Sequence, residues 1–456
     1  MKCADGSYAR GTVHEARTIL VVSATHRDHR EIRRLFPSGI DFRFHDYAST
    51  CLEELITGNE REGDRAEDPH IEVGRILAGL DGTKVAAVVS TDDYPGAALA
   101  AIIAQELGLP GPDPRAVLIA QHKYLSRLKQ VEAVPEAVPP FFLIDTAEGA
   151  ELPEERCFPL FVKPVKSFFS VGAEKVASRA ELVALLPRWR NCDEFFLPLE
   201  RMLERYVGGG IGSERLIAEG VLEGVQVTVE GYAFGGRATV MGVVDSIMFP
   251  GTIAFSRFDY PSRLPEDVQA RMADIAAKAM EALGFDNGLF NIEMMYDARS
   301  NRVSIIEINP RMASQFADLY EKVDGTSSYR ILLDIAEGRE PRFTRREGRH
   351  PFASSCVLRT FEDKIVARLP GEEELTHLEA LHPDIRVELH GQVGQKLSDE
   401  LQDGHSYRYG IVNLGGHDLA DVLAKFEAVN AMLGIVLIPA EASERPSGAE
   451  LAVAAG

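Results

Sequence analysis

The sequence predicts an α/β protein with several domains. Its 456 residues are enough for two to four domains with cores of ordinary size. Near the N-terminus, two apolar β-branched runs, residues 18–23 (TILVVS) and 85–89 (VAAVV), are each followed by a polar loop and a predicted helix. That order is typical of parallel α/β units. From Leu216 the pattern changes to long, nearly continuous strands, beginning with LIAEGVLEG, which indicates that a different region starts there.

The composition excludes several classes of protein. Hydrophobic residues make up 45% and charged residues 26%, as in an ordinary soluble globular protein. The formal charge of −21 argues against nucleic acid as a partner, and we interpret it as an aid to solubility. No apolar run is long enough to cross a membrane, and the N-terminus lacks a signal-peptide core. The five cysteines show no CxxC pair, which favours a reducing cytoplasm over a disulfide framework.

Two aspartates follow the second predicted strand. Asp92 and Asp93 stand at its carboxyl end, where α/β proteins bind small ligands. They can contact a substrate amine, or they can cap the helix predicted over residues 97–107, and we favour capping. Before them, residues 25–30 are expected to form a polar loop that precedes a short helix, and residues 59–68 a charged surface loop.

The middle of the chain carries two lysines of interest. Lys123 lies on a helix predicted over residues 114–131, and Lys163 lies in a predicted strand, LFVKP. The loops 165–172 and 206–213 are expected to be mobile, and consecutive glycines in the second hold no fixed conformation by themselves. The sequence contains neither a GxxxxGK[ST] P-loop nor a GxGxxG fingerprint after a strand.

The stretch 305–311 (IIEINPR) carries the clearest candidate site. Glu307 and Asn309 are two residues apart, so both side chains leave the same face of an extended strand. Pro310 cannot donate to a sheet, which predicts that the strand ends there, with Arg311 just beyond it.

A hairpin would complete this site. Residues 288–296 read as a strand joined to the IIEINPR strand by a turn over 297–301, and pairing the two brings Glu293 beside Glu307 and Asn309. Three oxygen ligands next to a cation suit Mg²⁺ that is shared with phosphate. An edge hairpin with solvated carboxylates fits the same residues.

The order of five motifs resembles the ATP-grasp superfamily, and more narrowly the carboxylate–amine ligases related to bacterial L-amino-acid (dipeptide) ligases. The motifs are, in order, Lys123, LFVKP, AEGVLEGVQ, FNIEMMYD and EINPR. The resemblance implies an α/β fold of the ATP-grasp type (α+β). The implied parts are a lead-in (1–17, expected to be disordered), a Rossmann-like pre-ATP-grasp domain (18–114), a two-part ATP-grasp domain (115–341) with a small lid (about 145–217), a C-terminal α+β domain (351–439) and a disordered tail (440–456).

The resemblance also implies roles for single residues. Lys123 and Lys163 match the lysines that hold the α- and β-phosphates of ATP, although Lys123 alone also fits a solvated helix charge. Glu219 and Leu222 match the hinge whose backbone binds adenine. Gln226 stands where many relatives have a ribose-binding acid.

Four further residues match the reacting end of the family's site. Glu293, Glu307 and Asn309 match the ligands of Mg²⁺, for which Mn²⁺ can substitute. Arg311 matches the catalytic arginine that steadies the transferring phosphoryl group and the acyl-phosphate. The implied function is an ATP-dependent ligase that joins a carboxylic acid to an amine and releases ADP and phosphate.

Two other functions fit parts of the sequence. A biotin-carboxylase-type enzyme uses the same core, but the residues after EINPR run MASQF and no biotinyl Met-Lys-Met segment exists in the chain. A non-catalytic nucleotide-binding protein would be expected to have lost some of the lysines and metal ligands, and all of them are present.

The sequence does not identify the two substrates. We expect a small carboxylic acid and an amine, with amino acids the first candidates, and a homodimer is compatible with the chain. Candidate substrate contacts are Asp92, Asp93, Arg257, Asp259, Tyr260, Ser314 and Gln315. Arg257 can pair with a substrate carboxylate through both arms of its guanidinium, or it can bridge two strands.

Overall fold

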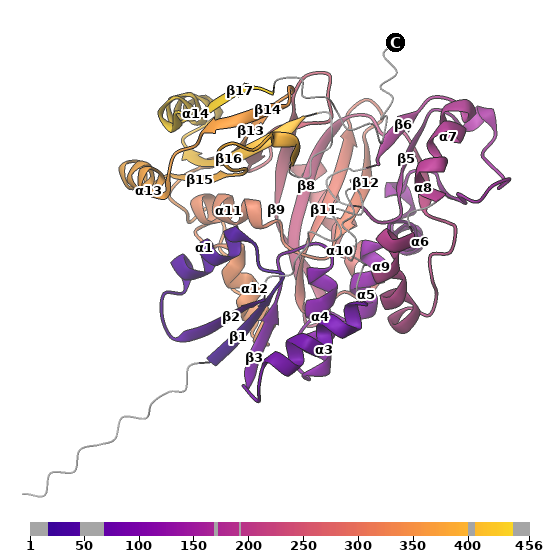
Figure 1. Ribbon diagram of the computed structural model, residues 1–456, viewed down its shortest axis with the longest axis horizontal. Coiled ribbons are helices and arrows are strands. Elements are labelled where there is room, and N and C mark those ends of the chain that lie inside the picture. Colours follow the sequence, from indigo (N-terminus) through magenta and orange to yellow (C-terminus); the bar gives the residue numbers. More distant parts are fainter. Residues whose placement is uncertain (1–16, 46–67, 168–171, 191–192, 400–405, 441–456) are drawn as a thin grey trace, which may run out of the picture.

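A computed structural model describes residues 17–45, 68–167, 172–190, 193–399 and 406–440 (Figure 1). An antiparallel sheet of eight strands forms its centre, in the order β12-β11-β8-β9-β10-β13-β16-β15. These strands are β8 (Val225–Phe234), β9 (Arg237–Met248), β10 (Phe255–Tyr260), β11 (Gly288–Asp297), β12 (Arg302–Asn309), β13 (Phe352–Thr360), β15 (Ile385–Leu389) and β16 (Tyr407–Gly416). The predicted α/β fold class is confirmed.

A parallel three-stranded sheet lies at the N-terminus, in the order β2-β1-β3. Its strands are β1 (Arg17–Val22), β2 (Ile40–His45) and β3 (Val85–Val89), and its helices are α1 (His26–Leu35), α3 (Pro69–Gly79) and α4 (Gly96–Glu106). The predicted loop over 25–30 is wrong, because α1 already begins at His26. Thr25 and Asp28 form a capping box that starts the helix there.

The helix predicted over 114–131 is two helices, α5 (Pro114–Gln121) and α6 (Lys123–Ala133). His122 interrupts it with an extended backbone, and its Nδ1 accepts a hydrogen bond from the backbone N–H of Leu125 at 3.3 Å. The N–H of Lys123 donates to the carbonyl of Val165 at 2.8 Å, outside the helix. The break therefore places Lys123 at the first residue of α6.

A smaller sheet lies on the right in Figure 1, in the order β4-β7-β5-β6. It contains β4 (Phe141–Ile144), β5 (Leu160–Pro164), β6 (Glu174–Val176) and β7 (Leu216–Gly220), together with helices α7 (Arg179–Leu185), α8 (Pro187–Arg190) and α9 (Asp193–Tyr206). The strand predicted from LFVKP is confirmed as β5. The predicted mobile loop 165–172 includes residues 168–171, which lie outside the described residues.

The two sheets are joined by residues 221–224. The sequence predicted one strand through LIAEGVLEG, but β7 ends at Gly220 and β8 begins at Val225. At Gly224, φ is +129° and an added Cβ would lie 2.1 Å from the carbonyl oxygen of Tyr296, so the joint needs glycine. The chain therefore changes sheets between Glu219 and Gln226.

The remaining helices cover the sheets. Helix α10 (Glu266–Leu283) packs against β9 and α6, and α11 (Ala317–Asp324) and α12 (Ser328–Ala336) pack against β13 and β11 respectively. The short helices η1 (Pro135–Ala137), η2 (Glu155–Cys157), η3 (Ser314–Phe316) and η4 (Leu397–Asp399) lie in connections. No described helix is both long and apolar enough to cross a membrane.

The C-terminal residues extend the central sheet. Strands β13, β15 and β16 continue it at upper left in Figure 1, while β14 (Lys364–Arg368) pairs with β17 (Val436–Pro439). The helices of this C-terminal region are α13 (Glu372–Leu381) and α14 (Leu419–Leu433). Of the segments expected to be loops or disordered, residues 1–16, 59–67 and 441–456 lie outside the described residues.

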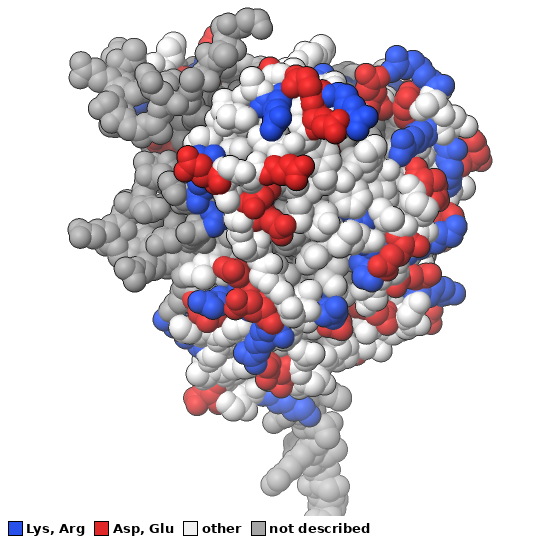
Figure 2. Space-filling model, turned by 90° about the vertical axis from the view of Figure 1, so that its right-hand side faces the viewer, with Lys and Arg blue, Asp and Glu red and all other residues white. Residues whose placement is uncertain are grey.

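Charged side chains are mixed over the face shown in Figure 2. Among the residues described there, lysine and arginine lie interspersed with aspartate and glutamate. Among its described residues, the basic side chains form no continuous stripe of the kind that binds nucleic acid backbones.

Candidate active site

The site is built on the β11–β12 hairpin. Glu293 pairs directly with Glu307, and Asn291 pairs with Asn309, so the predicted pairing is confirmed. Directly opposite residues share one face of a sheet with their Cβ atoms about 5 Å apart. Strand β12 ends at Asn309, immediately before the proline, as predicted.

Neighbouring strands extend the same face. Gln226 on β8 donates from its Nε2 to Oε2 of Glu293 at 2.9 Å. Glu230, further along β8, pairs with Asn291 and is fully buried. The face thus carries carboxylates and amides from three adjacent strands, instead of an apolar layer.

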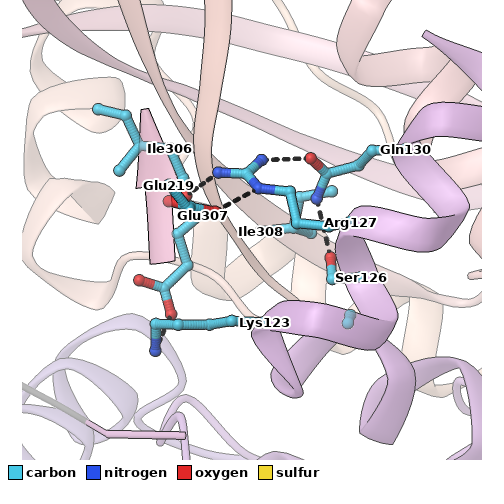
Figure 3. Close-up of a pocket in the computed structure, with 9 residues that line it drawn as sticks. Lys123, Ser126, Arg127, Gln130, Glu219, Ile306, Glu307 and Ile308 are labelled. Atoms are coloured by element: carbon cyan, nitrogen blue, oxygen red, sulfur yellow. Dashed lines mark hydrogen bonds and ion pairs between the residues drawn. The ribbon is translucent and has the colours of Figure 1, made fainter. Parts of the chain in front are cut away.

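Both predicted lysines lie at this face and are paired with predicted site carboxylates. Lys123 Nζ lies 2.9 Å from Oε1 of Glu307, and Lys163 Nζ lies 2.8 Å from Oε2 of Glu219. Both lysine side chains are almost completely buried. Figure 3 shows Lys123 reaching Glu307 from the start of α6.

Arg127 is a central residue that the sequence reasoning missed. Its side chain is 2% exposed, and its Nε donates to Oε1 of Glu219 at 2.6 Å (Figure 3). Its Nη2 donates to the carbonyl of Ile306 at 2.8 Å, and its Nη1 donates to Gln130. The available signal was its position four residues after Lys123, which is one turn along the same helix face.

These pairs determine the charge states of the carboxylates. Burial alone would raise the pKa of Glu219, but Lys163 and Arg127 together lower it to about 2. Burial also opposes ionisation of Glu307, and Lys123 and Lys163 outweigh it, so its pKa lies below the usual value. Burial and the neighbouring Glu307 raise the pKa of Glu293 to about 7.

The ion pairs close the space between α6, β7 and β12. The cavity there has a volume of about 10 Å³, enough for roughly one water molecule. It is lined by Ala120, Lys123, Ser126, Arg127, Gln130, Glu219, Ile306, Glu307 and Ile308.

Arg311 and the two aspartates meet at the end of the hairpin. Asp92 accepts a hydrogen bond from the N–H of Gly96 at 2.8 Å, so it caps the start of α4. Asp93 points to the site instead: its Oδ2 lies 2.6 Å from Nζ of Lys166, and its Oδ1 lies 3.8 Å from Nε of Arg311. Burial opposes its ionisation, but Lys166 and Arg311 lower the pKa of Asp93 to about 2.

Three candidate substrate contacts on β10 do not join this site. Asp259 is fully buried and accepts hydrogen bonds from Arg257 and from Ser354, at 2.6 Å for the serine. Tyr260 is buried and donates to Asp324 at 2.5 Å. Phe258 pairs with Ser246, which pairs with Gln226, so Phe258 faces the site while Arg257 and Asp259 face away.

Residues 156–318 match the sequence profile of the ATP-grasp domain. This region contains Lys163, Glu219, the hairpin and Arg311. The chain therefore contains an ATP-grasp domain over these residues. The predicted resemblance to ATP-grasp proteins is confirmed for this domain.

Two curated relatives of this chain are a synthase and a ligase by name. Human carnosine synthase 1 is 30% identical over 54% of the chain, and the chain spans only 30% of that protein. The D-alanine–D-alanine ligase of Bordetella petrii is 28% identical over 50% of the chain and 68% of the relative.

Solved structures share the fold over nearly the whole chain. The L-amino acid ligase of Bacillus licheniformis superposes with a TM-score of 0.68 over 93% of this chain and 99% of that one, at 18% identity. The biotin carboxylase of Campylobacter jejuni gives 0.62 over 93% of both chains, at 16% identity. At these identities the similarity shows the fold alone.

The side-chain oxygens at the hairpin are of the kind that fits a magnesium ion sharing its coordination with phosphate. The described residues contain no group of three or more His, Cys, Asp or Glu side chains arranged to hold a metal by themselves. Mg²⁺ commonly takes one or two carboxylates and completes its octahedron with water and substrate phosphates. Glu293 and Glu307 with Asn309 supply a set of that kind.

We predict that Glu219→Gln destabilises the fold by about 3–5 kcal/mol at neutral pH, because it leaves Lys163 and Arg127 buried beside an uncharged partner. The pKa of Glu219 is lower in the folded chain, at about 2, than the ordinary value of 4.5. Its ion pairs therefore stabilise the fold above pH 4.5, and this contribution is lost as the pH falls towards 2.

Urea unfolding of both proteins between pH 7 and pH 3 measures this effect. The difference in free energy of unfolding between wild type and Glu219→Gln should become smaller as the pH falls. Glu154→Gln is the matched control, because it removes a glutamate that pairs with Arg156 at the surface. Equal losses of stability in the two variants would contradict the assignment.

Proposed function

We propose that the protein is an ATP-dependent carboxylate–amine ligase that forms an amide or peptide bond and releases ADP and phosphate. The observation that carries the proposal is the arrangement of two buried lysines around a hairpin with two carboxylates and an amide, with an arginine at its end. The names of the two relatives, a synthase and a ligase, support this function. Because the chain spans less than a third of the human relative, that protein's substrates are not transferred to it.

We assign the nucleotide to the space between the two sheets. Lys123 and Lys163 would hold the α- and β-phosphates as point charges, and Glu219, Leu222 and Gln226 would contact the adenosine. Gln226 supplies an amide where a ribose-binding acid would otherwise stand, and its Nε2 is already bonded to Glu293. Glu293, Glu307 and Asn309 would hold Mg²⁺ or Mn²⁺, which offsets phosphate charge during transfer.

The chemistry needs positioned charges and no protein nucleophile. A carboxylate is a poor electrophile, because its charge repels an amine and it would have to expel oxide. Its oxygen therefore attacks the γ-phosphorus of ATP, the bond to ADP breaks, and an acyl-phosphate forms. The amine then attacks the acyl carbon, loses a proton, and phosphate leaves. Arg311 lies where it can stabilise charge in both steps.

The small cavity supports a moving lid. A space of about 10 Å³ cannot hold an adenine nucleotide, so β5 would have to move away from β12. We propose that residues of about 145–217 move as the lid, with residues 221–224 as the joint. Opening would separate Lys163 from the carbonyl of Ile306, which lie 3.3 Å apart in the structure.

Asp93 is our candidate for the substrate amine. Asp92 is used at the start of α4, whereas Asp93 lies between Lys166 and Arg311 at the reacting end of the site. A substrate carboxylate would pair with Arg311, and the ammonium group would compete with Lys166 for Asp93. A cytoplasmic location and a homodimer stay predictions from the sequence.

The function is tested by ADP and phosphate release across a panel of amino acids and small acids with Mg²⁺. We expect slow release with the correct acid alone, by water capture of the activated acid. Adding the amine should accelerate release and give an amide in equal amount. Hydroxylamine should trap the activated acid as a hydroxamate.

Two outcomes of this screen would overturn the proposal. Turnover that requires bicarbonate and biotin, and never an amine, would mean that the chain catalyses carboxylation. ATP binding with no turnover across the full panel would favour a non-catalytic protein.

We predict that Arg311→Lys lowers kcat by a factor of about 100 or more while the Kd for ATP changes little. Lysine keeps the charge but loses the planar fork that binds two oxygens at once. Arg299→Lys is the control, because Arg299 lies exposed in the turn of the same hairpin and pairs with Glu223. A parallel loss of ATP affinity in Arg311→Lys would assign this arginine to nucleotide binding instead.

A further inference from the structure

Three consecutive residues just after Arg311 are each held from a different part of the fold. We call residues 313–315 the anchor segment. The N–H of Ala313 donates to Oε1 of Glu230 on β8 at 2.6 Å. The hydroxyl of Ser314 accepts from Nη1 of Arg27 on α1 at 2.8 Å. The contacts of Gln315 lead to the C-terminal strands.

Gln315 is fixed by both its side chain and its backbone. Its Nε2 donates to the hydroxyl of Ser355 on β13 at 2.8 Å. Its carbonyl accepts from Nδ2 of Asn413 on β16 at 3.2 Å. Ser355 and Asn413 pair with each other across the two strands, so they form one binding surface for this residue.

Arg27 connects the anchor segment to a third C-terminal strand. Its Nε and Nη2 each lie 2.7 Å from an oxygen of Glu388 on β15, which is a two-point ion pair. This pair orients the guanidinium so that the remaining Nη1 meets Ser314. Arg30, one turn along α1, donates to the carbonyl of Val387 at 2.9 Å and strengthens the contact between α1 and β15.

We propose that Glu388 and Asn413 are positioning residues for Arg311, and that the C-terminal strands serve to place this arginine. This inference rests on the proposed function. Glu388 acts through Arg27 and Ser314, and Asn413 acts through the carbonyl of Gln315. It assigns a role to residues 351–439, for which the sequence suggested none.

The anchor segment is close to Arg311 along the chain, so its contacts can determine where Arg311 lies. Ser314 is three residues from Arg311, and the N–H of Arg311 is bonded to the carbonyl of Asn309 in a tight turn at 2.8 Å. A shift of the anchor segment therefore moves Arg311 relative to the hairpin and to Asp93. Displacing a group that touches the reacting atoms by about 1 Å can cost on the order of 100-fold in rate.

The proposed nucleotide site should not move when the anchor segment shifts. Lys123, Lys163 and Glu219 are held by contacts with α6, β5, β7 and β12, none of which involves the anchor segment. Loss of the C-terminal contacts should therefore lower kcat without changing nucleotide binding. If these C-terminal contacts had a merely structural role, their loss would lower kcat, the affinity for nucleotide and the stability of the fold together.

Ser314→Ala and Glu388→Gln, alone and combined, test the proposal. We expect each single variant to lower kcat by about 10-fold to 100-fold, with the KM for ATP unchanged within about twofold. The double variant should be no worse than the more severe single, because both changes break the same chain of contacts. Ser314→Ala removes one half-buried hydroxyl, so it keeps the test decisive even if Glu388→Gln folds poorly.

Glu321→Gln is the matched control. It removes a glutamate that pairs with Arg34 on the same helix α1 but has no contact with the anchor segment. We expect its kcat to stay at the wild-type value. If Glu321→Gln lost as much kcat as Glu388→Gln, any weakening of the contacts of α1 would impair the enzyme, which would contradict the proposal.

Amide hydrogen exchange of full-length protein separates this inference from the proposed function. In Ser314→Ala and Glu388→Gln, a peptide covering residues 309–320 should exchange faster than in wild type, while a peptide covering β5 should not. This readout applies even if the wild type proves to have no ligase turnover. Unchanged exchange over 309–320, or additive effects in the double variant, would overturn the inference.

Discussion

The need to pair two buried lysines governs the structure of the site. An unpaired ammonium group in the protein interior costs several kcal/mol, so Lys123 and Lys163 each have a carboxylate within 3 Å. The partners, Glu307 and Glu219, come from different sheets. Lys163 also donates to the carbonyl of Ile306 on β12, and Arg127 binds both Glu219 and that carbonyl, so these contacts hold the small sheet against the hairpin around a cavity of about 10 Å³.

The pair of Lys123 and Glu307 links nucleotide entry to metal binding in the proposed mechanism. In the proposed mechanism, phosphates would replace Glu307 as the partner of Lys123, and a metal ion would replace Lys123 as the partner of Glu307. Each exchange alone would leave a buried charge without its partner, whereas the two together keep the site neutralised. Arg127 stays bonded to Glu219 and to the carbonyl of Ile306, which gives the joint between the sheets a fixed point.

The sequence predicted the features that depend on local pattern. Glu307 and Asn309 share a face because they are two residues apart on a strand, and Pro310 marks its end. A short turn between the two runs was enough to pair Glu293 with Glu307. The ordered motifs indicated the ATP-grasp domain, because several chemically specific positions had to occur in one order.

Features that depend on distant contacts were missed. The helix break at His122 follows from a hydrogen bond between Lys123 and Val165, which local propensity cannot indicate. Arg127 was missed because its partners lie 92 and 179 residues away. On β10, Arg257 and Asp259 were chosen although they face away from the site: alternation shows that Phe258 and Asp259 face opposite ways, but only the pairing register shows which one faces the site.

The exchange of partners at Lys123 is tested most directly by calorimetric titration of ADP into wild type and Glu307→Gln, with and without Mg²⁺. Without the metal, Glu307→Gln should bind ADP more tightly than wild type, because Lys123 has lost its competing carboxylate. With Mg²⁺ the order should reverse, because the variant has lost a metal ligand. Weaker binding by the variant in both conditions, or no difference in either, would contradict the account.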